Sequence, residues 1–140
     1  MADGMTARFE TKRPLVIVVD DDPAVRGSLK FSLELEGFAV HAYGSGAELL
    51  HDGDFDTCRC FVIDQRMPAM TGMELIARLR DQKILTTAIL IISQPSTALS
   101  ARATAAGVHI VEKPLLGNTL LEQIRVACGR ECESEGSSAP

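Results

Sequence analysis

The sequence has no excess of basic residues and no long apolar run. Its 140 residues include 14 Lys and Arg against 19 Asp and Glu, which gives a net charge of −5. Nucleic-acid surfaces need clustered Lys and Arg to neutralise phosphates, so this composition argues against direct nucleic-acid binding. No stretch approaches the roughly 20 apolar residues of a membrane-spanning helix, and the N-terminus lacks the apolar segment of a secretory leader. We therefore expect a cytoplasmic protein without membrane contact.

The cysteines lack the usual spacing of a zinc site. Cys58 and Cys60 form a C-x-C pair, and Cys128 and Cys132 form a C-x-x-x-C pair, whereas structural zinc sites commonly use C-x-x-C pairs. We interpret all four as reduced, structural thiols, because unpaired cysteines are often buried. Disulfides or a bound metal remain the alternatives.

Apolar strand-like runs alternate with segments of helical periodicity along most of the chain. The predicted strands cover residues 15–19, 38–43, 60–63, 88–92 and 108–111. The predicted helices cover residues 23–35, 46–50, 72–82, 97–106 and roughly 120–127. This alternation is typical of an α/β protein with a parallel sheet and crossover helices. We predict a flavodoxin-like open sheet of five parallel strands, in the order 2-1-3-4-5, with helices on both faces.

The first predicted helix has clear start and stop signals. Asp22 followed by Pro23 is typical of an N-cap and the first helical position, and Gly37 is expected to end the helix. We predict an apolar face made by Val25, Leu29, Phe31, Leu33 and Leu35.

The chain has room for one domain and shows no internal repeat. We expect a flexible N-terminal extension over residues 1–13, a folded domain over 14–130 and a flexible tail over 131–140, because both ends are small or polar.

Three acidic residues follow two of the predicted strands. Asp20 and Asp21 end the first strand and Asp64 ends the third. These strands are neighbours in the predicted order, and ligands of such sheets bind beyond the carboxyl ends of the strands. Clustered carboxylates raise a pKa or recruit a cation, and oxygen ligands favour Mg²⁺ together with phosphate groups.

The same edge of the sheet carries the other parts of a phosphoryl-transfer site. Asp64 can act as the nucleophile, since a carboxylate can form an acyl phosphate. Lys113, at the end of the fifth strand, can supply positive charge to the phosphoryl oxygens.

Three segments resemble the signatures of response-regulator receivers. They read VIVVDDDPAVR, VIDQRMPAMTG and VEKP, and the resemblance covers Pro14 to Arg130. It implies that Asp64 is the phosphoacceptor, that Asp21 binds Mg²⁺ directly, and that Asp20 often binds it through water. The Arg66 backbone carbonyl would complete the metal ligands.

The resemblance also implies further roles and partners. Lys113 would pair with a phosphoryl oxygen, the Lys113–Pro114 peptide would be cis, and Pro68 and Gly72 would shape the loop after Asp64. The implied partners are a sensor histidine kinase or phosphotransfer protein and a downstream protein target. The last two helices and the fifth strand would form the output surface, where the chain could also dimerise. Such a domain is a signalling switch, not an enzyme.

Two positions depart from the family pattern. Receivers carry Ser or Thr at the end of the fourth strand, where ungapped counting places Ile92, and Ser93 comes one residue later. A bulge at the strand end could still aim Ser93 at the phosphoryl group. Ile110 stands at the usual aromatic switch position. Phosphoacceptance is therefore better supported than the usual switching route.

Two other functions fit parts of the sequence. The departures at Ile92 and Ile110 would suit a receiver-like adapter that works without phosphorylation. A D-x-D within Asp20–Asp22 resembles the nucleophile motif of haloacid-dehalogenase-like phosphatases, but Pro23 and Ala24 stand where that family continues with a Gly-Thr-like pair.

Overall fold

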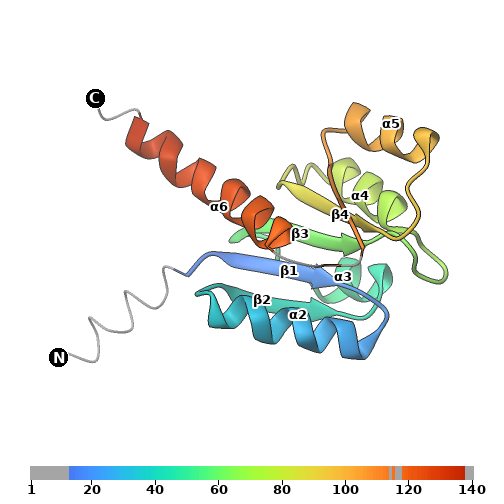
Figure 1. The fold of residues 1–140 in the computed structure, drawn as a ribbon, viewed down its shortest axis with the longest axis horizontal. Helices are drawn as coiled ribbons and strands as arrows, with labels where there is room; N and C mark the ends of the chain where they lie inside the picture. Colours follow the sequence, from blue (N-terminus) through green and yellow to red (C-terminus); the bar gives the residue numbers. More distant parts are fainter. Residues whose placement is uncertain (1–12, 114, 116–117, 138–140) are drawn as a thin grey trace.

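The computed structural model describes residues 13–113, 115 and 118–137, with side chains described up to residue 129. Its sheet has five parallel strands in the order β2-β1-β3-β4-β5, as predicted (Figure 1). The strands are β1 Leu15–Val19, β2 Ala39–Tyr43, β3 Cys58–Asp64, β4 Ala88–Ile92 and β5 His109–Glu112. Strands β1, β3 and β4 are central, which explains why their sequences are almost continuously apolar.

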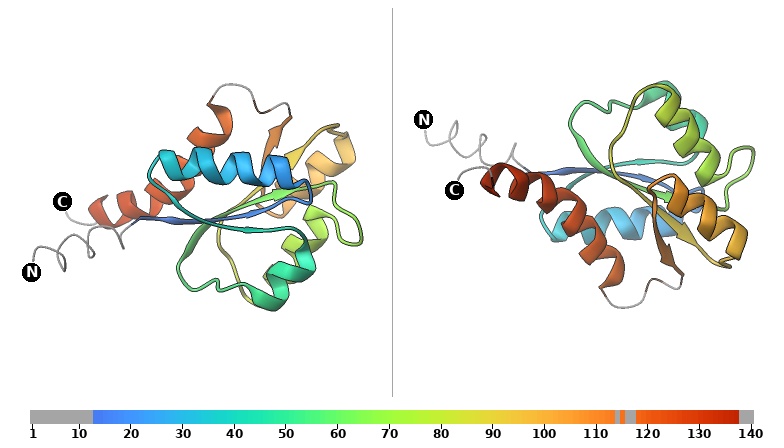
Figure 2. Two further views of the ribbon diagram at one scale, coloured as in Figure 1. Left: turned by 90° about the horizontal axis from the view of Figure 1, so that it is seen from below. Right: turned by 90° about the horizontal axis from the view of Figure 1, so that it is seen from above.

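Helices connect the strands and cover both faces of the sheet (Figure 2). They are α2 Pro23–Leu35, α3 Gly46–Asp52, α4 Gly72–Asp81, α5 Thr97–Ala105 and α6 Thr119–Ser137. Leu33 of α2 and Leu120, Ile124 and Ala127 of α6 pack on one face. The opposite face packs against Leu49 of α3, several residues of α4 and Ala103 of α5.

Side-chain caps fix where these helices begin. Asp22 Oδ1 accepts hydrogen bonds from the backbone of Ala24 and Val25, and Pro23 is the first residue of α2. Ser45 and Ser96 cap α3 and α5 through their hydroxyls. The predicted Asp22 cap is confirmed.

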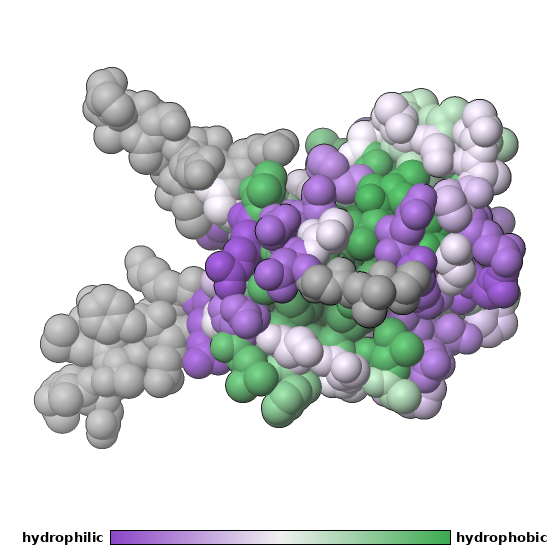
Figure 3. Space-filling model, viewed as in Figure 1, coloured by the Kyte–Doolittle hydropathy of each residue, from purple (hydrophilic) through white to green (hydrophobic). Residues whose placement is uncertain are grey.

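The apolar face predicted for α2 is partly wrong. Leu33 is buried and Leu29 packs against the same core, but the side chains of Phe31 and Leu35 are 65% and 70% exposed. Each helical residue turns by about 100°, so Phe31 and Leu35 lie on the far side from Leu33. Figure 3 accordingly shows hydrophobic residues at the lower edge of the molecule, where α2 runs.

An irregularity in β3 separates two cysteines that alternation would place on the same face. The β1–β3 register shifts between Leu15–Cys58 and Val16–Cys60, so Cys58 and Cys60 pack on opposite faces of the sheet. Their Sγ atoms donate to the carbonyls of Cys60 and Phe61 at 3.3 and 3.6 Å. Burial raises the pKa of the Cys60 thiol well above its usual range. These features agree with structural thiols, and Cys132 lies beyond the described side chains.

The last helix is longer than its periodicity predicts. It runs to Ser137, past the predicted domain end at Arg130. The side chains beyond residue 129 are not described, and the flexibility of the tail over 131–140 stays a prediction. None of the helices in the described part of the chain is long and apolar enough to cross a membrane.

Candidate phosphoryl-acceptor and metal site

The three predicted carboxylates meet at the carboxyl edge of the sheet. Asp20 directly follows β1 and Asp64 is the last residue of β3; their exposed fractions are 1% and 4%. Asp21 is exposed to solvent. One carboxylate oxygen from each of the three lies within 4.8 Å of the others. Strand order alone brings these residues together from distant parts of the sequence.

One oxygen of Asp20 is buried without a partner. Its Oδ1 accepts from the Asp22 backbone N–H at 2.9 Å, but Oδ2 has no hydrogen-bond partner among the described residues. A buried carboxylate oxygen is costly to leave unpaired. A hard cation between the three carboxylates would satisfy it, so these residues fit Mg²⁺.

Burial raises the pKa of both Asp20 and Asp64. For Asp64, the hydrogen bond from Lys113 opposes this effect, and the neighbouring charge of Asp20 adds to it. For Asp20, the hydrogen bond from the Asp22 N–H and the positive charge of Lys113 partly oppose the rise in pKa. Separately from these shifts, three carboxylates lie together and the Lys113 ammonium pairs with one of them, an arrangement that suits a divalent ion.

Lys113 directly follows β5, and its side chain reaches Asp64. Its Nζ lies 3.1 Å from Asp64 Oδ1, and its backbone N–H donates to the Ile92 carbonyl at 2.7 Å. The predicted proximity of Lys113 to Asp64 is therefore present. Pro114, and with it the predicted cis peptide, lies outside the described residues.

The loop after Asp64 is closed by Gln65 and Gly72. Gln65 Oε1 accepts from the Met73 backbone N–H at 2.9 Å, and the Gly72 N–H donates to the Gln65 carbonyl at 3.1 Å. A Cβ on Gly72 would lie 2.6 Å from Leu90 Cδ1 and 2.7 Å from the Asp64 carbonyl oxygen. Gly72 is thus required by close packing beneath the phosphoacceptor candidate. Arg66 and Pro68 are both exposed in this loop.

The end of β4 presents a hydrocarbon side chain to the core. Ile92 is 2% exposed and packs in the cluster that also contacts Ile110, whereas Ser93 is exposed. The β4–β5 register is regular up to Ile92–Glu112. No bulge between these strands therefore redirects Ser93, which follows the last pair, and its role in the site stays a prediction.

Comparison with known proteins agrees with this architecture. Residues 16–125 match the response regulator receiver domain family. The chain belongs to this family. The receiver is 34% identical over 119 residues to the transcriptional regulatory protein FixJ of Azorhizobium caulinodans, covering 84% of this chain and 56% of that protein. It is 33% identical to the C4-dicarboxylate transport transcriptional regulatory protein DctD of Pseudomonas aeruginosa, covering 80% of this chain and 24% of that protein.

Solved structures of receivers share the fold. A CheY-like receiver domain protein of Methanospirillum hungatei superimposes with a TM-score of 0.80 at 25% identity, covering 88% of this chain and 99% of that one. The response regulator StyR gives a TM-score of 0.79 at 29% identity, covering 90% and 64%. The receiver spans about half the length of the first curated relatives it matches. Receiver domains are generally non-enzymatic signalling domains. The family match therefore favours a receiver over the haloacid-dehalogenase-like phosphatase considered from the sequence.

Two residues that contact the site were not predicted. Arg26 Nη1 donates to the Asp20 carbonyl at 2.7 Å, and Gln65 joins the loop to α4 as described above. Side-chain contacts with a backbone carbonyl or N–H leave no periodic or motif signal in a single sequence, although Arg26 stands inside the acidic segment that marks the receiver.

Proposed function

We propose that Asp64 of this receiver accepts a phosphoryl group from a sensor histidine kinase or a phosphotransfer protein. The single observation that carries this proposal is the position of Asp64, buried at the end of β3 beside Asp20 and Asp21 and paired with Lys113. An oxygen of the Asp64 carboxylate attacks phosphorus, the bond from phosphorus to the donor breaks, and an acyl phosphate forms.

The surrounding residues have separate roles in this proposal. Asp20, Asp21, Asp64 and the Arg66 carbonyl would hold Mg²⁺, which when bound neutralises phosphoryl charge. Lys113 pairs with Asp64 before transfer and is placed to pair with a phosphoryl oxygen afterwards. Ser93 is the candidate hydroxyl, with Ile92 occupying the ungapped position.

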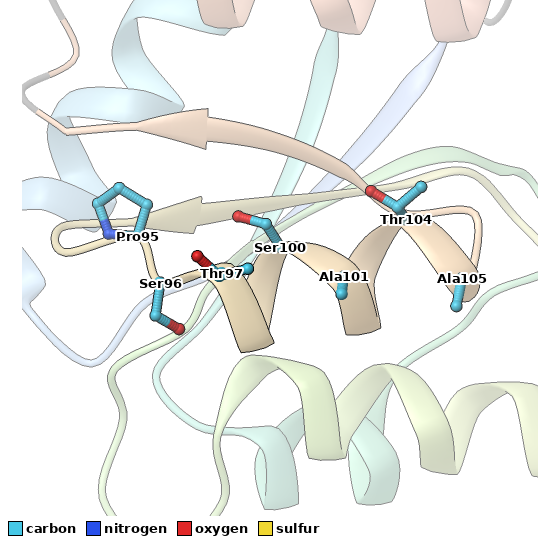
Figure 4. A pocket seen from close by; sticks show the side chains of 7 residues that line it. All are labelled: Pro95, Ser96, Thr97, Ser100, Ala101, Thr104 and Ala105. Atoms are coloured by element: carbon cyan, nitrogen blue, oxygen red, sulfur yellow. The ribbon is translucent and has the colours of Figure 1, made fainter.

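The output surface in this proposal is formed by α5, β5 and α6, where a downstream protein or a second copy would bind. Ala103 of α5 is buried and Leu99 packs, partly buried, against the same cluster, so few apolar side chains hold this helix to the sheet, as is typical of elements that move. The helix and the turn before it also border a shallow pocket that is wide open to solvent (Figure 4). It is lined by Pro95, Ser96, Thr97, Ser100, Ala101, Thr104 and Ala105. We place this signalling in the cytoplasm and expect no direct nucleic-acid contact.

Beryllofluoride tests phosphoacceptance because it binds carboxylates as a phosphoryl mimic. With Mg²⁺ present, it should raise the unfolding temperature of the wild type and leave Asp64→Asn unchanged. An equal shift in both proteins would place the binding elsewhere.

A specific observation also favours the adapter function. Ile92 belongs to an apolar cluster against which Ile110 packs, and neither side chain can hydrogen-bond a phosphoryl group. The adapter predicts that beryllofluoride shifts neither protein, and that Asp64→Asn binds the downstream target as tightly as the wild type does.

A further inference from the structure

Arg26 folds back from α2 onto the main chain where β1 ends. The β1–β2 register ends at Val19–Tyr43, and the Asp20 N–H donates to the Tyr43 carbonyl at 3.1 Å. The Asp20 carbonyl therefore lies just past the last strand pair. Arg26 Nη1 donates to this carbonyl at 2.7 Å, which satisfies a backbone acceptor at the edge of the acidic site.

The absence of a side chain at Gly44 makes room for the guanidinium. A Cβ at this position would lie 3.2 Å from Arg26 Nη1 and 3.6 Å from its Cζ. The Gly44 N–H is held by Glu48 Oε1 at 2.8 Å. A Cβ at 44 would require the Arg26 guanidinium to move by a few tenths of an ångström, and a β-branched side chain would require more.

The hydrogen bond from Arg26 to the Asp20 carbonyl is not explained by the stability of α2 itself. Arg26 is the fourth residue of the helix, and a cation near a helix N-terminus is disfavoured by the helix dipole. Among the described residues, no carboxylate forms an ion pair with Arg26, whereas Lys113 pairs directly with Asp64. The guanidinium thus acts on the backbone rather than as a counter-charge.

We infer that Arg26 is a positioning residue for the metal ligands Asp20 and Asp21. The Asp20 carbonyl belongs to the planar peptide unit that contains the Cα atoms of both residues. A hydrogen bond that fixes this plane also fixes the directions in which both carboxylates leave the backbone. The inference rests on the proposed function, because it takes the acidic cluster to bind Mg²⁺.

The first test compares Mg²⁺ affinity by calorimetry in the wild type, Arg26→Ala and Arg26→Lys. Loss of a group that orients metal ligands typically weakens affinity by roughly 10- to 100-fold. We expect about a 10-fold weaker affinity for Arg26→Ala and partial recovery with Lys, which keeps one reachable donor. Lys30→Ala is the matched control, because Lys30 lies on the same helix and, among the residues that the structure describes, pairs with the exposed Glu34 alone.

A double-mutant cycle tests the route of the effect. Gly44→Val should weaken Mg²⁺ binding in the wild-type background, because it displaces the guanidinium. It should cause no further loss in the Arg26→Ala background. Unfolding temperatures measured without Mg²⁺ identify any variant that has lost its fold. If Arg26→Ala does not fold, the Mg²⁺ affinity of Arg26→Lys is compared with that of the wild type instead.

The outcomes separate this inference from the proposed function. If the wild type binds no Mg²⁺, the proposed metal site is wrong and the role of Arg26 falls with it. If the wild type binds but Arg26→Ala binds equally well, only the positioning role is overturned. Additive effects of Gly44→Val and Arg26→Ala would also overturn it. A lower unfolding temperature with unchanged affinity would show that Arg26 is merely structural.

Discussion

Asp20 and Asp64 carry their negative charges where water hardly reaches them. Burial raises the pKa of both carboxyls above the ordinary value of 3.8. The folded protein therefore binds protons more tightly than the unfolded chain does. The charged cluster lowers the stability of the metal-free fold in return for a site that favours a cation.

The pH dependence of stability should show this cost. Between pH 3.8 and the raised folded-state pKa values, the folded state holds more protons than the unfolded state, so these two groups make the free energy of unfolding fall as pH rises. We expect Asp64→Asn to gain stability relative to the Mg²⁺-free wild type as pH rises through this window. Urea unfolding at several pH values measures this, and a difference that is constant with pH would contradict it.

Substitutions of Ile92 test whether the end of β4 can accommodate a hydroxyl group. Ile92→Val should lower the free energy of unfolding by about 1 kcal/mol. Ile92→Thr should cost a further 1–2 kcal/mol or so, because its hydroxyl replaces a methyl group among apolar side chains. Denaturant unfolding of this nearly isosteric pair isolates the hydroxyl. If Thr costs no more than Val, the position already offers a polar partner.

At the scale of single elements, the helix α4 and the loop before it hold Asp64 in place. The α4 N-terminus has a capping box between Thr71 and Glu74, and Gly72 sits against the Asp64 carbonyl. The sequence motif suggested that Gly72 shapes this loop, but only the packing shows why a side chain is excluded.

Two glycine substitutions should have opposite effects. Gly72→Ala would force a Cβ against Leu90 and Asp64, so we expect a loss of about 2–3 kcal/mol. Gly27→Ala lies in α2 with nothing within 4 Å and should gain about 0.5–1 kcal/mol. Thermal unfolding compares them, and a harmless Gly72→Ala would refute the packing account.

The elements were predicted best where a local signal is strong. The continuous apolar runs of β1 and β4 and the Asp22–Pro23 start of α2 were placed correctly. The irregularity before Cys60 and the exposure of Phe31 depend on how neighbouring elements pack. Such packing leaves no separate signal in the sequence.

At the scale of the whole molecule, strand order builds the site. The predicted order placed Asp20 and Asp64 on adjacent strands, and the structure brings their carboxylates together with Asp21. The contacts of Arg26 and Gln65 could not be predicted in this way, because they depend on side-chain conformations after the fold has formed.

Metal binding should be visible as stability of the entire domain. A ligand that binds only the folded state at 100 times its dissociation constant adds about 2.7 kcal/mol. We therefore expect saturating Mg²⁺ to raise the unfolding temperature of the wild type by several degrees, and to have much less effect on Asp21→Asn. Equal shifts in the two proteins would mean that Mg²⁺ acts outside the acidic cluster.

Phosphoryl transfer to the Asp64 carboxylate should leave a covalent product of defined mass. Intact mass spectrometry after treatment with acetyl phosphate, with and without Mg²⁺, tests it most directly in the wild type and Asp64→Asn. We expect the mass of one added phosphoryl group in the wild type, dependent on Mg²⁺ and absent from Asp64→Asn. A folded wild type that gains no phosphoryl group under any of these conditions would contradict it.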